Sequence, residues 1–352
     1  MLIVNLTERQ ILEISTGSVF RAIILVLFFI FLYILKDVLI VFLFSLIIAS
    51  AISPFANWLD QKRIPRLWGV LLLFLVVIGL MALIASLVIP SISADVDQLV
   101  TVLPATFERV STSLETVQQG APSYLDFVSE IQNILGVLSS YLQQLSQSAI
   151  GLIVGIFGGV VSFLAVLVLS FYLSVTKRGV ENFLNSVVPE KYESYVTDLW
   201  ERSEKKVGLW LQGQMLLALI VGLAVYVGLS LMGIKFALIL GLLAFAFEIV
   251  PVVGPVLAAI PAVILAFLQG PTMGLWVIVF YVAVQQLENH ILVPVVMGKT
   301  VGLNPVVVII ALLIGANLAG IAGMIISIPV ATVIVEVLDD MAKKKESRRQ
   351  IV

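Results

Sequence analysis

Cysteine is absent from the 352-residue sequence, and histidine occurs once. The first absence excludes disulfides, thiolate metal sites and cysteine nucleophiles together. Charge is also scarce, because 12% of the residues are charged and the formal net charge is only -2. Nothing in that balance indicates a nucleic-acid partner, whose recognition needs a basic surface. We therefore expect no cofactor, no metal centre and no nucleic-acid binding.

Enzyme motifs are lacking as well. The sequence contains neither HExxH nor GxSxG, and no paired aspartates fall inside its apolar runs. Its first residues, MLIVNLTERQILEIS, include Glu8 and Glu13 and no basic region before a cleavage site. We expect a protein that is not an enzyme and that keeps its first hydrophobic segments.

Apolar residues are what the sequence has in abundance. They make up 61% of it, compared with roughly half in soluble domains. We predict an all-α polytopic membrane protein with about eight transmembrane or re-entrant segments. The apolar runs cover residues 20–35, 38–53, 67–89, 150–175, 211–232, 236–268, 275–296 and 305–336. The first two are separated only by Lys36 and Asp37, and we expect a tight hairpin there rather than one long bent helix.

Lys and Arg residues predict the orientation, since they accumulate in cytoplasmic loops. They gather in residues 53–66, 177–210 and 338–352, whereas residues 91–149 are acidic apart from Arg109. Both termini should therefore be cytoplasmic. The predicted parts are 1–90 with three spans, 91–149 outside, 150–176 as a fourth span, 177–210 as an amphipathic cytoplasmic linker, 211–337 as the membrane core and 338–352 as a basic tail.

The acidic outer segment, residues 91–149, has two stripes of apolar residues at a spacing near 3.5, separated by Gly120–Ser123. Such stripes predict an extracytoplasmic hairpin of two amphipathic helices. The stripes can pack on each other, or also between subunits or on the membrane surface.

The membrane core contains signals for broken helices. Between Lys235 and Lys299 the only charged residues are Glu248 and Glu288, and each precedes a Pro-Val-Val. The run 236–268 would be about 50 Å long as a straight helix, well beyond a hydrocarbon core of ~30 Å. Proline removes a backbone donor, and glycine tolerates unusual torsion angles. The candidate break residues are Pro251, Gly254, Pro255, Pro294, Gly298, Pro305, Gly315, Gly320 and Gly323.

Small residues recur four apart at Gly315, Ala319 and Gly323. This spacing fits either a close helix crossing or an unwound binding segment around Asn317. Broken helices in membranes line cavities or lie inside protein, and paired broken segments point to a transporter binding site.

The stretch QQLENH, residues 285–290, places several polar groups inside the core. Gln285, Glu288 and Asn289 share one helix face, with His290 beside it. Ionisable groups in membranes mark ion or proton pathways. The alternatives are an anchoring role for Glu288, helix capping by Glu248 and a hydrogen-bonded structural role for His290. The candidate substrate or ion ligands are Glu288, Asn289, Gln285, Glu248, Asn317 and His290.

The segment QQLENHILVPVVMGKTVGLNPVVVIIALLIGANLAGIAGMIISIPVA, together with the upstream EIVPVVGP, resembles the signature region of the autoinducer-2 exporter (AI-2E) family. The resemblance covers essentially the whole chain. It implies an oligomeric transporter of the prokaryotic inner membrane, with some members linked to export of autoinducer-2 and others to exchange of sodium or lithium for protons. It supports Glu288, Asn289, Pro294, Gly298 and Pro305 as pattern positions.

Taken together, these patterns predict an ion-coupled secondary transporter or exporter of a small polar solute or signal. One alternative is a Na⁺(Li⁺)/H⁺ antiporter; others are an oligomeric channel and a non-transporting scaffold. The expected partners are the lipid bilayer, further copies of the chain, and a small polar solute or monovalent cation.

Overall fold

The computed structural model describes residues 16–80, 82, 83, 86, 159–176, 178–297 and 302–349. Within these ranges the chain forms helices and turns and no strand, so the all-α prediction is confirmed. The predicted outer hairpin and Gly298 lie outside the described residues.

The helices follow one another as α1 (Thr16–Ile34), α2 (Lys36–Gln61), a helix over Arg66–Leu80, α6 (Val160–Val175), α7 (Gly179–Val187), α8 (Glu190–Leu231), α9 (Ala237–Phe247), α10 (Val253–Gln269), α11 (Pro271–Leu287), the π turn η1 (Glu288–Leu292), α12 (Val293–Val296) and α13 (Pro305–Arg349). Four stretches of these are long and apolar enough to cross a membrane: Lys36–Gln61, Glu190–Leu231, Pro271–Val296 and Pro305–Glu346. Helices α6 and α7 would add a fifth across a sharp bend. The remaining predicted segments form shorter apolar helices.

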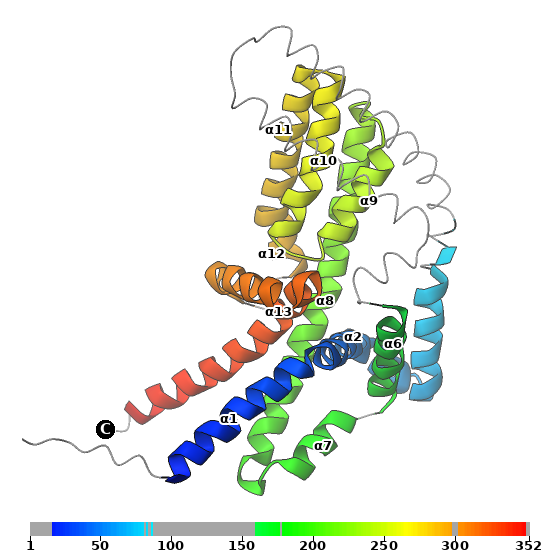
Figure 1. Ribbon diagram of the computed structural model, residues 1–352. Coiled ribbons are helices and arrows are strands. Elements are labelled where there is room, and N and C mark those ends of the chain that lie inside the picture. Colours follow the sequence, from blue (N-terminus) through cyan, green and yellow to red (C-terminus); the bar gives the residue numbers. More distant parts are fainter. Residues whose placement is uncertain are drawn as a thin grey trace, which may run out of the picture.

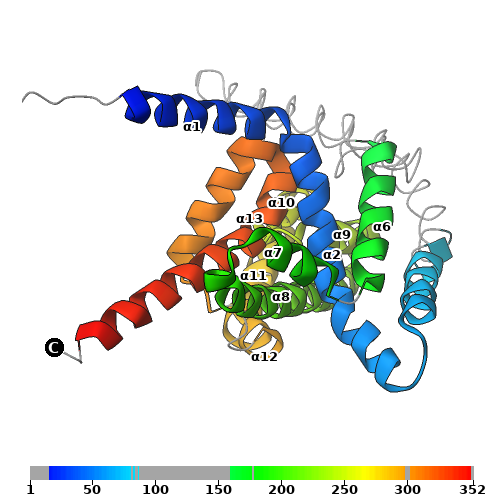
Figure 2. The same cartoon turned by 90° about the horizontal axis from the view of Figure 1, so that it is seen from below.

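The hairpin expected between the first two apolar runs is wrong. Only Leu35 separates α1 from α2, and helical hydrogen bonds continue on both sides of it: its amide donates to Phe31 O at 3.0 Å, and Leu39 donates to Leu35 O at 2.9 Å. The two helices leave this bend in different directions (Figure 2). Lys36 and Asp37 therefore lie inside helical structure and do not mark a turn. The negative charge of Asp37, in the first turn of α2, interacts favourably with the helix dipole.

Within the described ranges α8 is the longest unbroken helix, with 42 residues and a length of about 63 Å. It contains no proline and runs through both the predicted linker, 177–210, and the predicted span, 211–232. The boundary expected at residue 210 thus falls inside one continuous helix. Two groups of helices pack against its two halves (Figure 1).

The first group, here called the upper bundle, consists of α9, α10, α11 and the C-terminal half of α8. Its core is apolar and includes Val225, Leu229, Leu240, Ala262 and Val277. Helices α8 and α9 approach closely, because a Cβ atom at Gly222 would lie 3.0 Å from the carbonyl oxygen of Gly241. Small residues in both helices therefore allow this contact.

The direction of each helix follows from such contacts. Gly222 lies beside Gly241, and Gln214 lies beside Glu248, so α8 and α9 are antiparallel. Gly213 likewise lies beside Met297, and Gly228 beside Phe280, so α8 and α11 are antiparallel too. Helix α10 joins α11 through a tight turn at Gly270 and returns alongside it (Figure 1). Helix α9 therefore runs one way and α10 the other.

The predicted segment 236–268 is consequently a hairpin of two helices and not one straight helix. Helix α9 has 11 residues, or about 16 Å, which is about half of a hydrocarbon core of ~30 Å. The chain turns at residues 248–252, and α10 returns to the end from which α9 started. This turn, here called the hairpin tip, lies beside the middle of α8.

The second group, here called the lower body, consists of α2, α6, α13 and the N-terminal half of α8. Its core includes Phe44, Val166, Trp210, Leu312 and Ile328, and Val250 of the hairpin tip also packs into it. The tip therefore contacts both packed groups.

Helix α13 is sharply kinked. Ala319 (φ -149°, ψ 24°) and Gly320 (φ 58°, ψ -135°) leave the helical region. Gly315 then packs against the backbone of Gly323, where neither residue has room for a Cβ atom. The spacing of small residues thus allows a close contact between the two halves of α13 itself, on either side of an unwound point.

Candidate functional site

The hairpin tip is built from residues that interrupt a helix. Val252 has φ 69°, a torsion angle that is strained for a β-branched side chain. Gly254 packs so closely on the carbonyl group of Phe247 that no side chain would fit. Pro251 lies in the turn, and Pro255 lies in the first turn of α10. The break therefore comes from the local sequence, and it leaves backbone carbonyl groups of α9 without helical partners.

Glu248 ends α9 at this tip. The residue is only 1% exposed, and no donor among the described residues reaches its Oε2 atom. A carboxylate in such a position is costly unless it is neutralised or paired. The break therefore places an ionisable group where no fixed partner satisfies it fully.

Glu288 begins a second irregularity, the π turn η1. The amide of Val293 donates to Glu288 O, five residues earlier. Pro294 follows but does not end the helix, because α11, η1 and α12 continue as one stretch over Pro271–Val296. The expected break at Pro294 is therefore wrong. Proline has no amide hydrogen to donate, and the π turn before it accommodates this loss without interrupting the helix.

The two acids meet although they are 40 positions apart in sequence. Their carboxyl groups lie close enough to interact electrostatically, and Glu288 is 5% exposed. Gln285 Nε2 donates to Glu288 Oε2 at 3.3 Å and lies 3.4 Å from Asn289 Oδ1. We call Glu248 and Glu288 the carboxyl pair.

The carboxyl pair has no cationic partner in the part of the chain that the structure describes, where no Lys or Arg makes an ion pair with either acid. Two carboxyl groups can share a hydrogen bond only when one of them carries a proton. Two neighbouring carboxylates in an apolar site would otherwise repel each other. The arrangement can therefore hold and release a proton.

The other candidate residues are more exposed than the two acids. Asn289 is exposed apart from its approach to Gln285. His290 is exposed, and its Nδ1 lies 3.0 Å from Gln286 O. Asn317 is exposed on α13 and donates to Leu313 O at 3.0 Å. Pro305 begins α13. The structure thus brings Gln285, Asn289 and the carboxyl pair together, and places His290 and Asn317 elsewhere.

Two polar residues near the upper bundle were missing from the sequence prediction. Gln214 of α8 is 2% exposed, and its side-chain amide donates to the backbone carbonyl of Glu248. Tyr281 of α11 has a buried hydroxyl without a hydrogen-bond partner among the described residues. The signal for Gln214 was present, because it is a polar residue within the apolar run 211–232.

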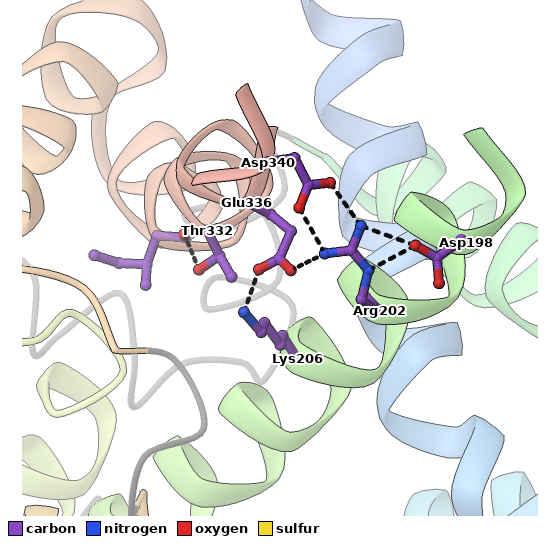
Figure 3. Close-up of polar contacts among 7 residues, drawn as sticks. Asp198, Arg202, Lys206, Thr332, Glu336 and Asp340 are labelled. Atoms are coloured by element: carbon purple, nitrogen blue, oxygen red, sulfur yellow. Dashed lines mark hydrogen bonds and ion pairs between the residues drawn. The ribbon is translucent and has the colours of Figure 1, made fainter. Parts of the chain in front are cut away.

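A second charged cluster joins α8 to α13 (Figure 3). Arg202 contacts Asp340 at 2.7 Å and Asp198 at 3.0 Å. Glu336 accepts hydrogen bonds from both Arg202 and Lys206. We call these five residues the ionic clamp. Each of its charges faces an opposite charge, so the clamp stabilises the packing of α13 on α8.

Metal binding has little support from the side chains. Within the described ranges no group of three or more His, Asp or Glu residues is arranged to hold a metal ion. The site contains the two acids of the carboxyl pair and the side-chain amides of the neighbouring Gln285 and Asn289. Its chemistry is that of proton exchange or of weak binding of a cation by oxygen atoms.

The fold and the site define a class: a multi-pass helical membrane protein with a helical hairpin whose tip brings one buried acid next to another. Residues 22–343 match the family model described as AI-2E family transporter. The chain belongs to that family, which confirms the resemblance found in the sequence, and its role is membrane transport.

Several relatives support this assignment. The chain is 32% identical to YueF of Bacillus subtilis (strain 168), over 78% of this chain and 76% of that protein. It is 27% identical to YhhT of Escherichia coli (strain K12), over 84% and 83% of the two chains. Both are named "Putative transport protein". TqsA of Escherichia coli (strain K12), named an AI-2 transport protein, is 24% identical over 87% of each chain.

Proposed function

We propose that the protein is a secondary transporter that exports a small polar solute or signal and couples this movement to protons at the carboxyl pair. The observation that carries the proposal is the contact between Glu248 and Glu288. These buried acids come from two separate backbone irregularities and have no cationic partner among the described residues. Such irregular segments in membrane proteins mark binding sites.

The contact offers a physical link between protonation and shape. With one proton the two groups attract each other through a hydrogen bond, and without it they repel. Two unit charges 4 Å apart interact by about 4 kcal/mol at an effective dielectric constant of 20. Loss of the proton therefore favours separation of the hairpin tip from η1, which is the kind of change that alternating access requires.

The cargo belongs to the same proposal. The relative TqsA is named for transport of AI-2, so autoinducer-2 is the first solute to test. Exchange of sodium or lithium for protons is the second candidate. It is favoured by the oxygen atoms that Glu248, Glu288 and Asn289 place near one another, since hard cations prefer oxygen ligands.

The orientation and assembly remain part of the proposal. The start of α1, the start of α8 and the end of α13 lie at the end of the molecule opposite the α10–α11 turn (Figure 1). This arrangement supports cytoplasmic termini, together with the basic residues gathered in 53–66, 177–210 and 338–352. We place the protein in the prokaryotic inner membrane as a homo-oligomer.

Flux into proteoliposomes tests the function. The purified full-length protein is assayed with autoinducer-2, sodium and lithium, with and without an imposed pH gradient, and for counterflow. A secondary transporter gives flux driven by the gradient and shows counterflow. Glu288→Gln should abolish the driven flux, while Glu201→Gln, which alters an exposed acid of α8, should leave it unchanged.

The other outcomes have distinct signatures. Flux that persists without a gradient and shows no counterflow indicates a channel. Absence of flux for every solute and gradient indicates a scaffold. Driven flux that survives in Glu288→Gln removes the carboxyl pair from the mechanism.

A further inference from the structure

Gln214 is the polar side chain that α8 directs at the hairpin tip. It lies in the middle of α8, is almost completely buried, and donates from Nε2 to the backbone carbonyl of Glu248. The neighbouring Gly213 packs against Met297, just after α12. This point of α8 therefore contacts both chain segments that bear the carboxyl pair.

The carbonyl that Gln214 binds is one that the broken helix cannot satisfy. Helix α9 ends at Phe247, and the amides that follow turn to other acceptors: Val250 donates to Phe247 O, Val253 to Pro251 O and Gly254 to Val250 O. Since helix ends leave carbonyl groups unpaired and lipid supplies no donor, an outside donor is needed at Glu248. The side chain of Gln214 provides it.

We infer that Gln214 is a positioning residue, which holds the hairpin tip on α8 so that the carboxyl group of Glu248 faces that of Glu288. The inference deepens the proposed function and rests on it for its meaning. Among the residues that the structure describes, Glu288 is the ionisable group that interacts with the Glu248 carboxyl. If the hairpin tip moved away from α8, the carboxyl groups of Glu248 and Glu288 would separate, and no other described charge would take the place of Glu288.

A matched control lies two residues away on the same helix. Gln212 Nε2 donates to the backbone carbonyl of Ala51 in α2 at 2.6 Å. This bond is of the same kind, a glutamine side chain bound to the backbone of another helix, but it does not touch the hairpin tip. Gln212→Met therefore removes a comparable bond without altering the support of Glu248.

The experiment measures how close residues 248 and 288 lie to each other. Because the chain contains no cysteine, two introduced cysteines are the only thiols that can react. Glu248→Cys/Glu288→Cys is introduced into the full-length protein in liposomes and treated with a bis-thiosulfonate reagent that has a two-carbon spacer. The rate of intramolecular cross-linking is compared with and without Gln214→Met or Gln212→Met. We expect Gln214→Met to slow cross-linking at least about tenfold, as is reasonable for loss of a well-oriented contact, and Gln212→Met to change it less than about twofold.

Flux assays on chains that keep both acids supply a second readout. Gln214→Met should shift the pH at which driven flux is half-maximal, whereas Gln212→Met should change only the amount of folded protein. Equal cross-linking rates with and without Gln214→Met, or equal losses in the two variants, would overturn the positioning role. Failure of the cysteine pair itself to cross-link would overturn the contact. Slower cross-linking in Gln214→Met, with no driven flux in the wild type, would keep the positioning role and remove the proposed function.

Discussion

The carboxyl pair and the ionic clamp place acidic groups in two opposite settings. In the clamp, Glu336 and Asp340 of α13 face Arg202 and Lys206 of α8, so both acids of α13 have a cation from the other helix. In the pair, Glu248 and Glu288 face each other and no described Lys or Arg joins them. Acidic residues thus form ion pairs with Arg and Lys in the ionic clamp. In the carboxyl pair, acidic residues contact each other without a cation among the described residues.

On the proposed function, this difference separates charges that hold the fold together from charges that take part in transport. An acid already neutralised by arginine gains little by binding a proton or another cation, because the ion pair would first have to be broken. Two acids without a cation can take up a proton, a metal cation or a polar group of the solute. The account therefore predicts that changes to the pair affect transport and that changes to the clamp affect stability.

The largest effect should come from giving the pair a fixed cation. Gln285→Lys places an ammonium group three residues before Glu288, on the side chain that now donates to its Oε2. An ion pair of about 4 kcal/mol at an effective dielectric constant of 20 would hold the site closed. We expect driven flux to fall at least about a hundredfold, measured in proteoliposomes.

The control for this change is Gln286→Lys, at the exposed neighbour. It adds the same charge one position away, outside the contact. Equal loss of flux in both variants would show that added charge alone, and not neutralisation of Glu288, stops transport.

A smaller effect is expected when the clamp loses its shared acid. Glu336→Gln removes the partner of both Arg202 and Lys206, whose side chains are about a third exposed. We expect the free energy of unfolding to fall by about 2 kcal/mol, less than for a fully buried pair because of solvent screening. Thermal unfolding in detergent measures this change. Driven flux per folded molecule should be unchanged, and its loss would place the clamp in the transport mechanism.

A smaller effect is expected from salt, which weakens the ion pairs of the ionic clamp by screening. Raising ionic strength from about 0.05 M to about 1 M shortens the screening length to about 3 Å. The midpoint of thermal unfolding of the wild type should then fall by a few degrees. The variant Arg202→Gln, which already lacks the central cation of the clamp, should show a smaller decrease. An equal salt effect in both proteins would mean that the clamp contributes nothing measurable.

The smallest effect is expected at the lone histidine. His290 is exposed and contacts the backbone of its own helix, so it neither faces the pair nor joins the clamp. His290→Gln should change driven flux less than about twofold at any pH between about 5 and 8. A large pH-dependent change in that range would add His290 to the proton pathway.

Composition and pattern were sufficient for the fold class and for the two acids. Glu248 and Glu288 stood out because each is a charge inside a long apolar run, beside proline and glycine. The excess length of 236–268 likewise indicated a break near Pro251. Both features depend on residues that are close together in the sequence, so a single sequence is enough to predict them.

The spatial relations could not be predicted in the same way. Contact between Glu248 and Glu288 depends on the return of α10 alongside α9 and on the antiparallel packing of α8 and α11. Pro294 was misread because a π turn can take up a proline that would break an α-helix. The expected hairpin at Lys36 failed because two polar residues are compatible with a continuing helix. The sequence did not predict a role for Gln214, because a neutral amide costs less to bury than a charge and is therefore a weaker signal of function.

Infrared difference spectroscopy tests the central claim, that the carboxyl pair holds a proton without a cation, most directly. The spectrum of the protein in lipid is compared between acid and alkaline buffer, in the region of the protonated carboxyl C=O stretch. The account predicts a band that disappears in Glu248→Gln and in Glu288→Gln and remains in Glu201→Gln. A band that persists in both variants of the pair, or a wild type without the band, would contradict it.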